Sequence, residues 1–71
     1  MSISYKKLWK LLIDKDMTKT QLREKADIAT STLAKLSKDE QVSMDVLLRI
    51  CKTLDCDIAD IMELTKEPKN V

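Results

Sequence analysis

The chain contains no glycine in its 71 residues, and its one proline, Pro68, lies close to the C-terminus. Glycine and proline most often interrupt helices and form tight turns, so their absence favours helices joined by short connections, and strands are not expected. The sequence therefore predicts an all-α fold, a compact bundle of about five short helices. We expect one domain over residues 1–65, followed by a polar tail over residues 66–71.

The segment 17–38 predicts two short helices joined by a tight turn. Thr18 and Gln21 have the spacing of a capping box, in which the side chain of each residue binds the backbone N–H of the other. Leu22 and Ala26 lie four residues apart, on one face of the same helix. This pattern places the start of the first of the two helices at Thr18.

The second of these helices is expected over residues 30–37, after Asp27 has ended the first. Leu33 and Leu36 are three residues apart and are expected to face the core. The opposite face carries hydroxyl groups followed by cations, namely Thr30, Ser31, Thr32, Lys35 and Lys38. Every amphipathic helix has a solvated face, but Ser and Thr are weak helix formers, and Glu with Lys would be more usual there. The composition of this face therefore favours binding to a groove that is edged with phosphates.

This arrangement resembles the helix-turn-helix of the Cro/cI-type (XRE-like) repressor family, over about residues 8–64. The resemblance implies a lambda repressor-like DNA-binding domain. The family usually has glycine where this chain has Asp27 and Asp55. Asp adopts the required positive φ angle more readily than most residues, so we expect both turns to be kept. Lys19 stands where the family often has a Gln that braces the recognition helix, and Lys cannot accept a hydrogen bond from a neighbour.

The resemblance further implies that the second helix of the motif enters the major groove of DNA. Base contacts are then expected from the start of that helix, from Ala29, Thr30, Ser31, Thr32 and Lys35. Phosphate contacts are expected at helix N-termini and at nearby cations, from Thr18, Lys19, Thr20, Lys38, Ser43 and Lys10. Taken singly, each of these lysines fits an ordinary surface residue equally well.

Apolar residues at helical spacing predict a first helix over residues 5–15 and a strongly hydrophobic helix that Ser43 caps. A fifth helix is expected after Asp57. Its apolar residues are Ile58, Ile61, Met62 and Leu64. One recognition helix covers few base pairs, so specificity predicts a homodimer on a two-fold operator. The four apolar side chains either form the seam of that dimer or close the core of the monomer.

The charge is distributed unevenly although the net charge is only +1. Residues 1–40 hold nine basic and six acidic residues, whereas residues 41–71 hold four basic and six acidic ones. The basic half contains the helix-turn-helix, as a DNA-facing side would. The chain has no histidine and no glycine-rich phosphate loop, so we expect no enzyme, no catalytic residue and no cofactor. Cys51 and Cys56 are expected to be reduced thiols, without a metal site.

No apolar run approaches the roughly 18 residues that span a bilayer, and no signal pattern is present, so a cytoplasmic protein without membrane contact is expected. The predicted function is a sequence-specific regulator of transcription, a repressor by preference, that binds double-stranded DNA and no small-molecule ligand. The alternative is a protein-interaction module, similar to an antitoxin, that binds another regulator through its acidic C-terminal half. The operator and the regulated genes are left open.

Overall fold

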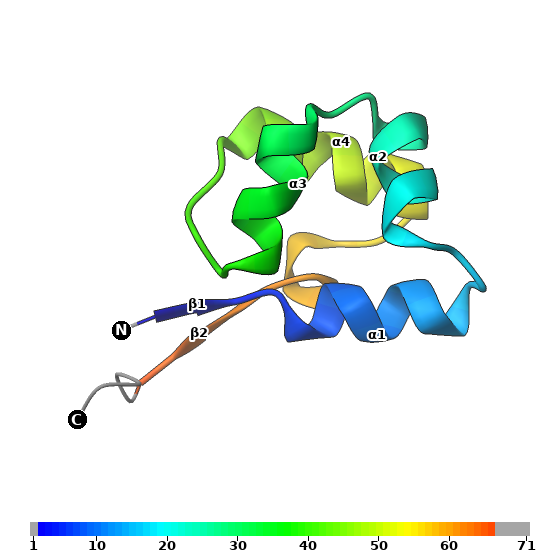
Figure 1. The fold of residues 1–71 in the computed structure, drawn as a ribbon. Coiled ribbons are helices and arrows are strands. Elements are labelled where there is room, and N and C mark those ends of the chain that lie inside the picture. Colours follow the sequence, from blue (N-terminus) through cyan, green and yellow to red (C-terminus); the bar gives the residue numbers. More distant parts are fainter. Residues whose placement is uncertain (1, 67–71) are drawn as a thin grey trace.

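Over residues 2–66, which are those the structure describes, the computed structural model contains four α-helices, one 3-10 helix and two short strands (Figure 1). The mostly helical fold agrees with the prediction. The elements are β1 (Ser2–Ser4), α1 (Lys6–Asp14), α2 (Lys19–Ala26), α3 (Thr30–Ser37), α4 (Met44–Leu54), the 3-10 helix η1 (Ile58–Asp60) and β2 (Glu63–Thr65). Within this part of the chain, no helix is long and apolar enough to cross a membrane.

One hydrophobic core holds the helices together, and α4 is its central support. The apolar face of α4 expected from its spacing is buried at Leu47, Ile50, Cys51 and Leu54 and half-buried at Val46. The other helices and the C-terminal segment add Tyr5, Leu8, Leu12, Leu22, Ala26, Ile28, Leu36 and Ile61. Each of these side chains gains roughly 1.5–3 kcal/mol on burial if it is as large as leucine or isoleucine, so the core is the main source of stability.

Aspartate ends all four α-helices in the left-handed conformation. The φ angles of Asp16, Asp27, Asp39 and Asp55 lie between 53° and 57°. After each of them, the next backbone N–H donates to the carbonyl five residues earlier, at 2.9–3.1 Å. This is the Schellman arrangement, which usually employs glycine. The prediction that Asp27 and Asp55 replace glycine at positive φ is confirmed, and the same substitution occurs at two further helix ends.

The predicted fifth helix is wrong in length. Asp57 caps η1, but η1 covers only Ile58–Asp60. The Asp57 carboxylate accepts from the Ile58 N–H at 2.8 Å, while the Asp60 carboxylate accepts from the Asp57 N–H at 3.0 Å. The helix does not extend further because residues 63–65 pair with β1, and this pairing requires an extended backbone. Ile61 and Met62 therefore lie in a connection, and Leu64 lies on a strand.

The expectation that strands are absent is also wrong. β1 and β2 pair antiparallel, with Ser2 opposite Thr65, Ile3 opposite Leu64 and Ser4 opposite Glu63. The two strands lie side by side and project from the helical body (Figure 1). Their partners are about sixty residues apart in the sequence, so no local pattern announces the pairing. Residues 67–71 of the predicted polar tail lie outside the described residues.

Candidate DNA interface

Helix α2 begins with the predicted capping box. The Thr18 Oγ1 accepts from the Gln21 N–H at 3.1 Å, and the Gln21 Oε1 accepts from the Thr18 N–H at 2.9 Å. The box does not use the first two amides of the helix, those of Lys19 and Thr20, which have no partner within the helix. The N-terminus of α2 therefore offers backbone donors and a partial positive charge to an anion.

The turn between α2 and α3 is short and fixed by hydrogen bonds. Asp27 has φ 56° and ψ 52°, and the Ile28 N–H donates to the Arg23 carbonyl at 3.1 Å. Ile28 is buried, which anchors the turn in the core. The next helix, α3, covers Thr30–Ser37, as predicted. Its N-cap residue is Ala29, which provides no side-chain hydrogen bond, so the first amides of α3 are left to other partners.

The outer face of α3 carries the residues predicted to meet DNA bases. Ala29, Thr30, Ser31 and Lys35 are exposed, whereas Thr32 is half-buried. Ser31 and Lys35 are four residues apart and therefore share one face. Ala34, which the sequence interpretation did not single out, is exposed as well. The face is thus a narrow, small-residue surface with a cation one turn from its start.

The inner face of α3 is less extensive than predicted. Leu36 is fully buried, but Leu33 is only half-buried and does not belong to the residues that pack against the core. The expectation that both leucines face the core is therefore wrong for Leu33. Leu33 lies on the same side of α3 as Leu36 but one turn nearer the start of the helix, where it is only partly covered.

Lys19 joins three helices. Its Nζ lies 4.2 Å from the centre of the Trp9 ring on α1 and donates to the Ser37 Oγ at the end of α3, at 3.5 Å. The sequence interpretation was that Lys19 cannot position a neighbour by accepting a hydrogen bond, as the family's Gln does. In the structure, Lys19 contacts α3 as a donor, and Ser37 is a partner that the spacing of the sequence did not indicate.

The remaining predicted phosphate ligands are dispersed. Thr20 and Lys38 are exposed. The Ser43 hydroxyl accepts from the Val46 N–H at 3.2 Å and so caps α4, as predicted. Lys10, by contrast, lines a hollow that also contains Asp55 and Asp60. Lys7, Lys15 and Asp14 line the same hollow, whereas none of the other predicted phosphate ligands does.

The far end of α3 is tied to the start of α1 through Tyr5. The buried Tyr5 hydroxyl donates to the Glu40 carbonyl at 2.8 Å, and the Tyr5 N–H donates to the Asp39 carboxylate at 3.0 Å. Burial, reinforced by the charge of Asp39, raises the pKa of the Tyr5 hydroxyl. Both ends of α3 are therefore fixed, the first by the turn at Asp27 and the second by this contact.

The residues proposed for a dimer seam occupy different environments. Ile61 is completely buried in the core of the monomer, while Ile58 and Met62 are half-buried against that core. Leu64 has 59% of its surface exposed. Of the two alternatives that the sequence left open, closing the monomer core applies to Ile61. Leu64 is the residue of this set that is most accessible to a second chain.

The two cysteines lie at the end of α4 as free thiols, Cys51 buried and Cys56 half-buried. Burial, together with the neighbouring Cys51, raises the pKa of Cys56 to about 11. The described residues contain no group of three or more His, Cys, Asp or Glu side chains that could hold a metal ion.

Comparison with known proteins gives two matches. Residues 7–67 match the family model of the Cro/C1-type HTH DNA-binding domain. The structure is similar to the crystal structure of the transcriptional regulator VanUg, Form II, with a TM-score of 0.90 and 56% sequence identity. That match covers 93% of this chain and 88% of the other chain. No curated protein matches the sequence significantly.

Proposed function

The chain belongs to the Cro/C1-type helix-turn-helix family of DNA-binding domains, and we propose on this premise that it is a sequence-specific regulator of transcription. In the proposed complex, α3 lies in the major groove and presents Thr30, Ser31 and Thr32 to the base edges. One observation supports this most directly. The start of α3 is an exposed run of small residues without a side-chain cap, which lies at the surface of the bundle directly after the turn at Asp27.

The proposed base contacts divide by chemistry. The hydroxyls of Thr30, Ser31 and Thr32 donate to or accept from base edges, and their aliphatic groups touch thymine methyls. Ala29 is small enough to let the helix approach the groove closely. Lys35, one turn after Ser31, reaches either the acceptor atoms of guanine or a phosphate.

Phosphate contacts hold α3 in register in this proposal. The amides at the start of α2, with Thr18, Lys19 and Thr20, form one phosphate seat, and Lys38 and Ser43 provide further contacts beyond the other end of α3. Lys19 is the best placed of these cations, because Trp9 and Ser37 hold its ammonium group near the start of α2. Lys10 belongs to this set only if DNA extends over α1.

A homodimer completes the proposal. Two recognition helices on a two-fold operator would read half-sites about 34 Å apart, one turn of DNA. For the seam we propose the β1–β2 ribbon with Leu64 and Met62, because Leu64 is an exposed apolar residue on a short strand. The regulation proposed is repression by occupancy, in which the bound dimer excludes polymerase. A DNA-binding protein shares a compartment with its target, so we propose a cytoplasmic location.

The proposal is tested by selecting bound sequences from a pool of random DNA duplexes with the purified chain. We expect the recovered sequences to share an inverted repeat with half-site centres about 10 base pairs apart. Recovery of unrelated sequences that bind as well as the starting pool would contradict specific recognition. Failure to retain any DNA at low salt would favour the protein-interaction module instead.

Two matched variants distinguish base contacts from phosphate contacts in the same selection experiment. Ser31→Ala should change the preferred base at one position of the recovered site, because it removes a proposed base contact. Thr20→Ala should weaken binding to all sequences equally and leave the preferred site unchanged, because it alters a proposed phosphate contact.

A further inference from the structure

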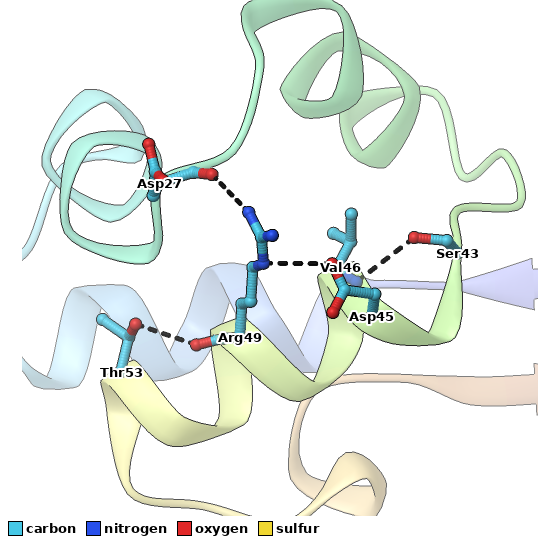
Figure 2. A network of polar contacts seen from close by, with 6 residues as sticks. All are labelled: Asp27, Ser43, Asp45, Val46, Arg49 and Thr53. Atoms are coloured by element: carbon cyan, nitrogen blue, oxygen red, sulfur yellow. Dashed lines mark hydrogen bonds and ion pairs between the residues drawn. The ribbon is translucent and has the colours of Figure 1, made fainter.

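Arg49 of α4 connects the turn of the helix-turn-helix to the body of the molecule. Its Nη1 donates to the backbone carbonyl of Asp27 at 2.9 Å, and its Nε lies 3.0 Å from the Asp45 carboxylate (Figure 2). The two bonds use different nitrogens of one planar guanidinium group. Together they fix both the position and the orientation of that plane.

The acceptor of this bond occupies a sensitive place in the motif. Asp27 is the left-handed residue between α2 and α3, and its backbone angles set the direction in which α3 leaves α2. A left-handed conformation is strained for a residue with a Cβ atom, so it persists only where its surroundings hold it. The Arg49 guanidinium binds the carbonyl of this very residue from outside the motif.

The base from which Arg49 reaches is itself rigid. Leu47 and Ile50, on either side of it in α4, are buried in the core. Ser43 caps the start of α4, and the Thr53 hydroxyl donates to the Arg49 carbonyl at 2.8 Å (Figure 2). Arg49 and Asp45 are themselves exposed, with side-chain accessibilities of 47% and 70%. A surface ion pair of this kind contributes little to stability. The main effect expected of Arg49 is therefore on the position of the turn, through its hydrogen bond to the Asp27 carbonyl.

We propose that Arg49 is a positioning residue for DNA recognition, which holds the α2–α3 turn at the angle that lets α3 fit the major groove. This inference rests on the proposed function. In it Arg49 touches neither bases nor phosphates, and Asp45 acts through Arg49 by orienting its guanidinium group. The sequence shows Asp45 and Arg49 as a common i, i+4 helix pair, whereas the contact with Asp27 arises only from the packing of α4 against the motif.

The test compares Arg49→Met with Lys52→Met, which removes the same charge from the same helix outside the network of Figure 2. Affinity is measured for the selected operator and for a random duplex, over a range of salt concentrations at which circular dichroism shows both variants folded. Arg49→Met should lower operator affinity by about tenfold, the factor that corresponds to one lost hydrogen bond to a charged group. Its affinity for the random duplex and its salt dependence should equal those of Lys52→Met.

Two additional variants keep the proposal open to refutation. Arg49→Lys keeps the charge but not the planar fork, so it should bind the operator as weakly as Arg49→Met. Asp45→Asn leaves Arg49 in place but removes its orienting carboxylate, and should cause a smaller loss. In the free protein, hydrogen exchange at the Ile28 amide should be faster in Arg49→Met than in Lys52→Met, because the turn opens more often.

Three results would overturn the proposal. Equal losses on both duplexes, with a salt dependence shallower than that of Lys52→Met, would make Arg49 a phosphate contact. Full operator affinity in Arg49→Met, or in Arg49→Lys, would show that the hydrogen bond from Arg49 to the Asp27 carbonyl does not position α3 for DNA binding. Unchanged exchange at Ile28 would show that the turn does not depend on Arg49. If the unaltered chain binds neither duplex, the proposed function itself fails, and the exchange measurement still reports on the turn.

Discussion

The ammonium group of Lys19 lies 4.2 Å from the centre of the Trp9 ring while donating to the Ser37 hydroxyl at 3.5 Å. A cation over an aromatic face is stabilised by roughly 0.5–1 kcal/mol at an exposed site. The contact therefore restricts a flexible side chain to one region beside the start of α2. A cation that is already in place loses less conformational entropy when it binds a phosphate.

Lys19→Gln should make DNA binding less dependent on salt. If Lys19 neutralises one phosphate, the slope of log K against log [salt] should become less negative by about 0.9. Lys25→Gln is the control, because Lys25 lies at the other end of the same helix. Titrations of both variants with one duplex at several salt concentrations give the two slopes. Equal slopes would exclude Lys19 as a phosphate ligand.

Asp55→Gly should stabilise the fold. Asp55 has φ 53°, where glycine avoids the steric cost that a Cβ atom imposes. Optimised helix ends commonly raise the free energy of unfolding by about 0.5 kcal/mol or more. The control is Glu24→Gly within α2, where glycine should cost about 1 kcal/mol. Urea unfolding measures both, and destabilisation by Asp55→Gly would show that the aspartate side chain stabilises the turn.

Ile61→Ala should affect the stability of the monomer, whereas Leu64→Ala should affect the proposed dimer. Ile61 is fully buried, so its truncation should lower the free energy of unfolding by about 2–5 kcal/mol. Leu64 is largely exposed, so its truncation should leave stability nearly unchanged but weaken the proposed dimer. Urea unfolding reports the first effect and sedimentation equilibrium the second. An unchanged association constant in Leu64→Ala would remove Leu64 from the seam.

Stability should fall in alkaline solution. The pKa of Cys56 is raised from 9.0 to about 11, so the folded chain retains a proton that the unfolded chain releases. This contribution is fully present below about pH 9 and is lost as pH rises toward 11. Cys51 and Tyr5, whose pKa values are also raised, act in the same direction. Urea unfolding between pH 8 and about pH 10.5 should show the decline, and Cys56→Ala should show a smaller one.

Local chemistry accounts for what the sequence predicted well. Thr18 with Gln21, and Ser43, satisfy amides within three residues of themselves, so their spacing alone indicates where α2 and α4 begin. Asp27 is a turn-forming residue that directly follows the last apolar residue of α2, so the end of that helix was also predictable. The bounds of α3, which were predicted from this turn and from the leucine spacing and not from a cap, are confirmed by the structure.

Contacts between distant residues account for what the sequence missed. Leu64 looked helical because its apolar neighbours are spaced by three, yet pairing with Ile3 makes it part of a strand. Ser37 and Arg49 are unremarkable in the sequence, because their partners Lys19 and Asp27 are about twenty residues away. In the candidate DNA interface, residue types were readable from the sequence, whereas the contacts that orient α3 required the fold.

Recognition through α3 is tested most directly by a titration of the chain with its selected operator and with a random duplex at two salt concentrations, repeated with the double variant Thr32→Ala, Lys35→Ala. If α3 reads the major groove, the unaltered chain should prefer the operator, and the double variant should lose that preference while it still binds the random duplex in a salt-dependent manner. Equal binding of both duplexes by the unaltered chain, or full operator preference in the double variant, would contradict recognition through α3.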